Sequence, residues 1–205
     1  MSKNEIMFKV ITLGDSGVGK TSIIRRYANN IFDDNVLSTV GVGFAFKEVE
    51  LSNKKKIKLK LIDTAGQEKF KSLAKSYFKN VDGVLFVYSF EILESFQNLK
   101  EWIKLFNSNH YGKNGIPMFL VGNKSDLEEK DDVENNEKLV KEFLNEYKDL
   151  KYYKTSAKKD ISINELFKEL AEKMFADYGK GGVHAQNSQL LKNFDEEKKQ
   201  HCKQC

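Results

Sequence analysis

Residues Gly14 to Thr21 read GDSGVGKT, with two glycines separated by four residues and followed directly by a lysine and a threonine. Such glycines let the backbone turn so that successive N–H groups point at phosphate oxygens, and a helix expected to follow would add its positive N-terminus. The Lys20 amine suits the β- and γ-phosphates of a nucleotide, and the Thr21 hydroxyl suits Mg²⁺. The residues predicted to bind the phosphates are Asp15, Ser16, Gly17, Val18, Gly19, Lys20, Thr21 and Ser22.

A second segment, LIDTAGQE, contributes groups of related chemistry. Asp63 ends an expected strand, where a carboxylate would hold Mg²⁺ through water. Gly66 has no Cβ, so its N–H can approach a terminal phosphate, and Gln67 can both donate and accept hydrogen bonds to orient an attacking water. We therefore predict hydrolysis of a nucleoside triphosphate, with Gln67, Lys20 and Thr39 as the catalytic residues.

Two later loops, GNKSD and TSAK, favour guanine as the base. The Asp126 carboxylate could accept from the N1–H and N2–H₂ of guanine, a pair of donors that adenine lacks. Asn123 could bind N7 and brace the phosphate loop, the Lys124 stem and Lys158 could cover the two faces of the base, and the Ala157 amide could donate to O6. A site built this way rejects a base that leaves its polar groups unpaired. The predicted base-binding residues are Asn123, Lys124, Asp126, Ser156, Ala157 and Lys158.

The segment 31–40 has no clear periodicity and is expected to be a loop over the nucleotide. Thr39 could give its hydroxyl to Mg²⁺ and its N–H to the γ-phosphate, and Phe32 could pack edge-on against the base, although an ordinary core position also fits Phe32. A contact that requires the γ-phosphate makes this loop a two-state element, ordered with GTP and looser with GDP.

Period-two and helical apolar patterns alternate along the chain. Segments 6–14, 83–90 and 115–123 are expected strands, and 44–51 with 56–63 is an expected hairpin. Helical spacing places Phe96, Leu99, Ile103 and Phe106 on one buried face, Leu139, Val140, Phe143, Leu144 and Tyr147 on another, and Ile163, Leu166, Phe167, Leu170 and Met174 on a third. Ser162 and Glu165 form a capping-box pattern before the last helix. The order predicts an α/β fold with a mostly parallel sheet, one antiparallel edge strand and helices on both faces.

Composition fits one domain, residues 1–178, followed by a polar tail, 179–205, predicted to be disordered. The 205 residues are 40% hydrophobic and contain one proline, and no Gly/Ser linker divides them. A net charge of +4 spread over many lysines and acids argues against nucleic-acid binding. We find no apolar run of membrane-spanning length and no signal peptide at the start, so a cytoplasmic location is expected.

The motifs together resemble those of the Ras superfamily of small GTPases, and within it the Rab family. GDSGVGKT, STVGVGF, DTAGQEKF, GNKSD and TSAK occur in the family's order, and the similarity extends over 9–177. The resemblance implies a P-loop NTPase G domain with six strands and five helices, a monomeric core, and Mg²⁺ with GTP or GDP as ligands. Two positions differ from the family pattern: Gly43 replaces a usual Asp and Ile62 a usual Trp, so Ile62 with Phe44 and Tyr77 is expected to form a smaller effector-facing patch.

The resemblance also implies a GTP-hydrolysing switch in vesicle trafficking that cycles to the cytoplasmic face of intracellular membranes. Its partners would be an exchange factor, a GTPase-activating protein, a GDP-dissociation inhibitor or escort protein, and effectors. Hydrolysis should be slow alone, because no arginine lies in 31–40 to act in cis.

The only two cysteines, Cys202 and Cys205, lie in the last four residues. A disulfide is unfavourable in a reducing compartment, and zinc would need more ligands than these thiols and His201. Lipid attachment is the favoured interpretation, since two chains anchor far better than one; a plain solvated tail is the alternative. CKQC departs from the usual Rab endings and, processed as a C-terminal prenylation motif, would carry one prenyl group on Cys202 rather than two.

Three other functions stay open at this point: a GTPase of another branch in signalling, a P-loop kinase or ATPase, and a scaffold locked to its nucleotide. The base-binding loops argue against adenine, and Gln67 with Thr39 argues against a locked scaffold.

Overall fold

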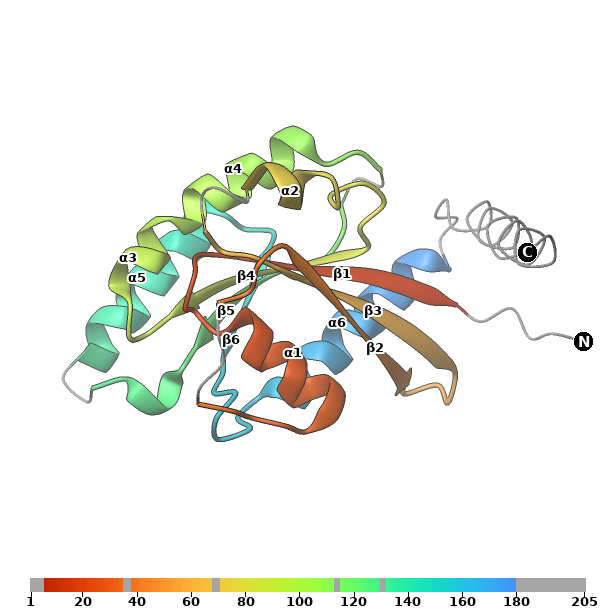
Figure 1. Cartoon of the computed structure of the whole chain (residues 1–205), viewed down its shortest axis with the longest axis horizontal. Coiled ribbons are helices and arrows are strands. Elements are labelled where there is room, and N and C mark those ends of the chain that lie inside the picture. The colour runs from red at the N-terminus through yellow and green to blue at the C-terminus, as the bar shows by residue number, and fades with distance from the viewer. Residues whose placement is uncertain (1–5, 35–37, 68–70, 113–114, 130–131, 180–205) are drawn as a thin grey trace, which may run out of the picture.

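A computed structural model describes residues 6–34, 38–67, 71–112, 115–129 and 132–179. In it a six-stranded sheet is covered by helices on both faces (Figure 1). The strands are β1 (Met7–Leu13), β2 (Val42–Glu50), β3 (Lys56–Thr64), β4 (Gly83–Ser89), β5 (Met118–Asn123) and β6 (Leu150–Lys154). The helices are α1 (Lys20–Asn29), α2 (Lys71–Lys75), α3 (Leu93–Gln97), α4 (Leu99–Asn109), α5 (Val133–Glu146) and α6 (Ile163–Tyr178), with a short 3-10 turn at Ser125–Leu127.

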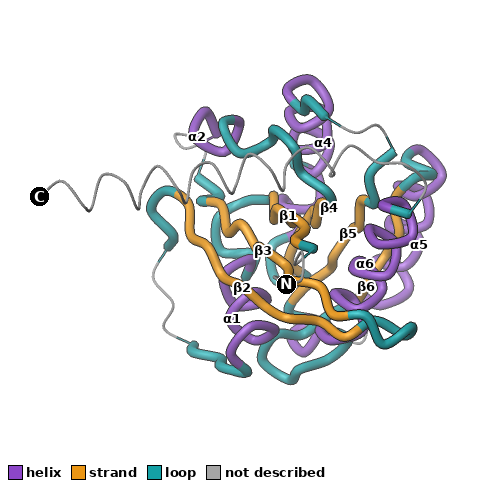
Figure 2. The backbone as a smooth tube through the Cα atoms, turned by 90° about the vertical axis from the view of Figure 1, so that its right-hand side faces the viewer, coloured by secondary structure: helices purple, strands orange, loops and turns teal. Residues whose placement is uncertain are grey.

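The sheet order is β2-β3-β1-β4-β5-β6, which Figure 2 shows as a continuous row of strands. Only β2 and β3 pair antiparallel, with Val42 opposite Thr64 and Glu50 opposite Lys56; the other four pairs are parallel. The predicted α/β fold with one antiparallel edge strand is therefore confirmed. Because parallel strands all point the same way, their carboxyl ends meet at one edge of the sheet, where ligands bind in such folds.

The helices differ slightly from the expected set of five. Four have ten or more residues, whereas α2 and α3 have five each. Asn98 alone separates α3 from α4, and its backbone stays helical, with its N–H bonded to the Glu94 carbonyl and its own carbonyl accepting from Trp102. We treat α3 and α4 as one unit, the α3–α4 unit, which gives five helical units in the described chain.

Each face of the sheet has its own apolar core. On one face, α1 and α6 pack on β1, β3 and β5, and Tyr27 of α1 stacks on Phe167 of α6 with 3.9 Å between ring centroids. On the other face, α2, the α3–α4 unit and α5 bury Trp102, Phe106 and Phe143. This two-sided burial explains the continuous apolar runs of β4 and β5. None of the described helices is long and apolar enough to cross a membrane.

Two local expectations were wrong. Leu139 is 39% exposed: the face of α5 that packs on the core carries Val140, Phe143 and Leu144, whereas Leu139 lines a small groove beside α3. Ser162 does precede α6, but it has a left-handed backbone with φ 56 and makes no side-chain cap bond. The Ser162 carbonyl accepts the Leu166 N–H as the first bond of the helix, but without a bond from the serine side chain the capping box does not form.

Candidate functional site

A cavity of about 330 Å³ opens at the carboxyl edge of the sheet. Its walls come from the loops after β1, β4, β5 and β6 and from the segment before β2. The predicted site residues that line it are Ser16, Gly17, Gly19, Lys20, Thr21, Ser22, Phe32, Thr39, Asn123, Lys124, Asp126, Ala157 and Lys158. The predicted residues that lie behind or beside these walls are Asp15, Val18, Asp63, Gly66, Gln67 and Ser156. Most of the predicted site is thus brought together in one cavity.

Lys20 is held by the backbone of its own loop. Its Nζ donates to the Gly14 carbonyl at 2.7 Å and to the Asp15 carbonyl at 2.6 Å, and the residue is only 5% exposed. Burial lowers the pKa of Lys20 to about 8, while the carboxylates of Asp63 and Asp15 act to raise it. A buried amine beside N–H groups provides concentrated positive charge, which suits a polyanion such as a nucleotide's phosphates.

Three oxygen-bearing side chains converge next to Lys20. Thr21 Oγ1 donates to Asp63 Oδ2 at 2.7 Å and lies 2.7 Å from Thr39 Oγ1. Burial raises the pKa of Asp63, although the hydrogen bonds from the two threonines and the charge of Lys20 counteract this. Asp63 Oδ1 is the buried side-chain atom without a hydrogen-bond partner in the described residues.

This cluster fits Mg²⁺. The ion prefers oxygen ligands and is usually held by one or two carboxylates plus phosphates and water, rather than by a complete protein cage. The unpaired Asp63 oxygen and the hydroxyls of Thr21 and Thr39 supply such donors. In the described residues no group of three or more His, Cys, Asp and Glu side chains is placed to hold a metal.

Gly66 lies directly against the phosphate-binding loop. A Cβ added at Gly66 would be 2.2 Å from the Asp15 carbonyl carbon and 2.3 Å from Ser16 N. Only a residue without a side chain therefore fits this contact. Gln67 is half-buried beside Gly66 but does not line the cavity. Its role in orienting water stays a prediction.

The two base-binding loops are joined through Asn123. The Asn123 amide donates to the Val18 carbonyl at 2.9 Å, and its oxygen accepts from the Ala157 N–H at 3.2 Å. Asp126 accepts a short hydrogen bond from Ser156 Oγ, which leaves its other oxygen for a ligand. The expected brace between Asn123 and the phosphate loop is present, and Ser156 lies behind the site as a support for Asp126.

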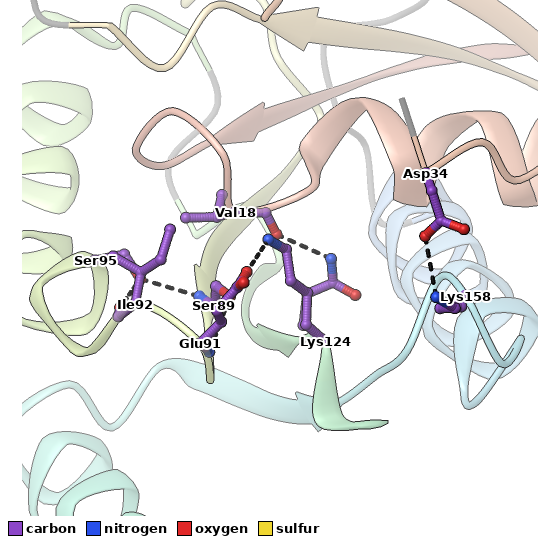
Figure 3. Close-up of polar contacts among 9 residues, drawn as sticks. Val18, Asp34, Ser89, Glu91, Ile92, Ser95, Lys124 and Lys158 are labelled. Carbon is purple, nitrogen blue, oxygen red and sulfur yellow. Dashed lines mark hydrogen bonds and ion pairs between the residues drawn. The ribbon is translucent and has the colours of Figure 1, made fainter. Parts of the chain in front are cut away.

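Both lysines expected to cover the base make ion pairs (Figure 3). Lys124 Nζ lies 2.5 Å from Glu91, which follows β4, and Lys158 Nζ lies 3.0 Å from Asp34. Phe32 lies close to Lys158, with its ring centroid 6.0 Å from Nζ. Both lysines also line the cavity.

Sequence reasoning missed several residues here. Asp33, Asp34, Ser38, Glu91 and Leu127 also line the cavity. Glu91 lies two residues after the central strand β4, and the rule that ligands bind beyond strand ends would have identified it.

Arg26 of α1 was also missed. Its Nε donates to the Ala157 carbonyl at 2.8 Å, and its guanidinium lies 5.9 Å from the Phe32 ring centroid. No sequence signal links α1 to that distant loop.

Comparison with known proteins agrees with this geometry. The model of the Ras family matches residues 9–176. The chain is 35% identical over 201 residues to Ras-related protein Rab-13 of Mesocricetus auratus, covering 96% of this chain and 95% of that protein. It is 36% identical over 177 residues to Ras-related protein Rab-30 of Homo sapiens, covering 86% and 84%, and 36% identical over 170 residues to Rab-10 of Diplobatis ommata, covering 82% and 81%. The chain belongs to the Ras family.

Ras family proteins are GTPases, so membership implies binding of GTP and GDP. The relatives named above are all Rab proteins, which agrees with the resemblance found in the motifs.

The expected effector-facing patch needs one correction. Ile62 is fully buried, so it adds nothing to the surface. Phe44 and Phe46 are 48% and 52% exposed on β2, Tyr77 lies 5.6 Å from the Phe44 ring, and Lys60 lies 4.6 Å above it. The surface there is an aromatic ridge beside a lysine. Gly43 has room for a side chain, since its Cβ position lies 3.6 Å from Asp63 Cβ.

Proposed function

We propose that this chain is a Rab-like molecular switch that binds GTP and GDP with Mg²⁺, hydrolyses GTP slowly, and regulates vesicle trafficking. The observation that supports this most is that the phosphate loop, Thr39 and both base-binding loops line one cavity. Its polar groups suit each part of a guanine nucleotide, and Asp126 has a carboxylate oxygen left for the base.

Each group has a separate task in the proposed reaction. Lys20 and the loop N–H groups bind the phosphates, while Thr21, Thr39 and Asp63 would hold Mg²⁺, which would offset phosphate charge during hydrolysis. Gln67 orients a water whose oxygen attacks the γ-phosphorus. The bond from that phosphorus to the β–γ bridging oxygen then breaks, so GDP and inorganic phosphate leave.

Slow turnover follows from the residues near the γ-phosphate. Segment 31–40 contains no arginine, so this loop supplies no second cation to the transition state. An arginine supplied by a partner raises such rates by roughly 10³ to 10⁵. We expect a GTPase-activating protein to supply that charge, and an exchange factor to speed GDP release.

The switch would act through 31–40 and the aromatic ridge on β2. Thr39 would contact the γ-phosphate only in the GTP state, and effectors would recognise the ordered surface near Phe44 and Phe46. The chain would act as a monomer in the cytoplasm and reach intracellular membranes through prenylated Cys202 and Cys205, with a GDP-dissociation inhibitor or escort protein handling the lipid. Both cysteines and the tail 180–205 lie outside the described residues.

Binding competition followed by single-turnover hydrolysis tests the proposal. The purified full chain should prefer GTP and GDP over ATP by at least 100-fold, because adenine would leave the Asp126 oxygen unpaired. Phosphate release from bound GTP should be slow and should fall further in Gln67→Leu. Equal affinity for ATP would refute a guanine site, and unchanged release in Gln67→Leu would refute the role of that glutamine.

The same assays separate the other candidate functions. A P-loop kinase or ATPase would bind ATP well, and a locked scaffold would release no phosphate. A fluorescent fusion with a free C-terminus would distinguish a trafficking protein on internal membranes from a signalling GTPase elsewhere.

A further inference from the structure

We infer that Asn98 and Trp102 are positioning residues for the phosphate-binding loop, and that they act through the carboxylate of Asp15. Trp102 Nε1 donates to Asp15 Oδ1 at 2.8 Å, and Asn98 Nδ2 donates to Asp15 Oδ2 at 2.8 Å. Both carboxylate oxygens therefore point to the α3–α4 unit, and Asp15 does not line the cavity. Its side chain ties the loop to a helix instead of binding a ligand.

The two donors lie on a rigid support. Trp102 is completely buried in the core between the sheet and the α3–α4 unit, and Asn98 occupies the junction of α3 and α4. Hydrogen bonds to an ionised acceptor are the stronger kind, and two of them fix both the position and the rotation of a carboxylate. Asp15 is therefore held in place from the helix side.

The backbone of Asp15 connects this tether to the phosphate site. Its carbonyl accepts a hydrogen bond from Lys20 Nζ at 2.6 Å. Its carbonyl carbon also lies 2.2 Å from the position that a Cβ on Gly66 would occupy, so the two backbones are in close contact there. A shift of Asp15 would thus move the carbonyl that accepts from Lys20 Nζ, and also the backbone against which Gly66 packs.

A second contact of the same unit supports a positioning role. Ile92, which precedes α3, lies with its Cδ1 3.6 Å from the Cβ position of Gly17 in the middle of the loop. Glu91 next to it pairs with Lys124 of a base-binding loop. The α3–α4 unit and the residues before it therefore touch the phosphate loop at two places and the base-binding loop at one.

The inference rests on the proposed guanine-nucleotide binding, and it predicts an effect on nucleotide retention beyond any effect on folding. Asn98→Ala should speed GDP release roughly tenfold or more, the range expected for loss of a hydrogen bond to a charged group. Asn109→Ala is the matched control, because Asn109 ends the same unit and its side chain donates within that unit, to the Leu105 carbonyl at 2.8 Å. Release from Asn109→Ala should stay within about twofold of the wild-type rate.

A double-mutant cycle identifies the route of the effect. In an Asp15→Ala background, Asn98→Ala should add less than about twofold, since the shared acceptor is gone. A full additive effect of Asn98→Ala in that background would overturn the inference, as would wild-type release from Asn98→Ala alone. If the wild-type chain retains no GDP, it is the proposed function that fails; if it does and Asn98→Ala behaves like wild type, only this inference fails.

Tryptophan fluorescence provides a readout that does not depend on a variant at a buried position. Trp102 is the only tryptophan in the chain, so the emission reports its indole alone. We expect the emission to change when GDP is removed from the wild-type protein, and this change to be lost in Asp15→Ala. Emission that is the same with and without GDP in wild type would contradict a link between the indole and the phosphate loop.

Discussion

Gly66→Ala should separate hydrolysis from nucleotide retention. The added Cβ would lie 2.2 Å from the Asp15 carbonyl carbon, whereas unbonded carbon atoms rest at about 3.5 Å, so one of the two segments must move by about 1 Å. Asp15 is fixed by Trp102 and Asn98, and its carbonyl is fixed by Lys20. The segment that carries Gly66 should therefore move, while the phosphate loop stays in place.

The displacement should reduce hydrolysis far more than binding. Gln67 follows Gly66 directly, and a 1 Å displacement of a positioned group lowers a rate by about 100-fold. GDP has no γ-phosphate for Gly66 to approach, so GDP release should change by less than about threefold. Single-turnover phosphate release and GDP dissociation, measured on the same preparation, provide the comparison.

Gly43→Ala is the control for this experiment. A Cβ at Gly43 would make ordinary contacts, 3.6 Å from Asp63 Cβ and 3.8 Å from Asp63 Oδ2, and its backbone is not left-handed. Hydrolysis by Gly43→Ala should match wild type. The reasoning is wrong if Gly66→Ala hydrolyses GTP at the wild-type rate. It is also wrong if the GDP dissociation rate rises by as large a factor as the hydrolysis rate falls, because the phosphate loop would then have moved.

Three further predictions follow from buried or bridging side chains. Ile62→Trp, which restores the residue usual in the family, should lower the free energy of unfolding by about 1–3 kcal/mol in urea, because Ile62 is fully buried in a packed core; an unchanged urea midpoint would count against that packing. Burial lowers the pKa of Lys20 from 10.5 in the unfolded chain to about 8 in the folded protein. Between pH 8 and pH 10.5 the unfolded chain therefore binds more protons than the nucleotide-free folded protein, so the free energy of unfolding should increase as the pH rises through this range. Between pH 7.5 and 9.5 the gain should be about 2 kcal/mol in wild type and absent in Lys20→Met, as measured by urea unfolding at each pH. Arg26→Met should speed GDP release several-fold, because it removes the hydrogen bond to the Ala157 carbonyl. A GDP release rate equal to wild type in stopped-flow exchange would show that the loop around Ala157 does not need this bond to keep its position.

The fold and most of the site could be predicted from the sequence because both depend on local pattern. The period of apolar residues identifies strands and helices, and the parallel order then places the loops after β1, β5 and β6 at one edge. The chemistry of the site can be predicted from the spacing of the glycines and from the residue types at Lys20, Thr21 and Asp126, both of which the sequence shows directly. Their gathering around one cavity follows from the order of the strands.

Contacts between distant segments could not be predicted in this way. The pairing of Glu91 with Lys124 and that of Asp34 with Lys158 join loops whose relative placement appears only after folding. The burial of Ile62 likewise depends on the core that it joins with Ala74 of α2 and Phe78, and no pattern in β3 alone shows it.

The role of the Asp15 side chain could not be predicted from the sequence pattern. In the sequence Asp15 is one position of a glycine-rich loop that is predicted to bind phosphates, and nothing in the pattern indicates where its carboxylate points. In the structure, two donors from residues 83 and 87 positions away turn that carboxylate from the cavity and bind it. An acid is thus tolerated beside an anion site because its charge is compensated on the helix side. If Asn98→Ala speeds GDP release as we infer, the same compensation also makes the α3–α4 unit part of the machinery that holds the nucleotide.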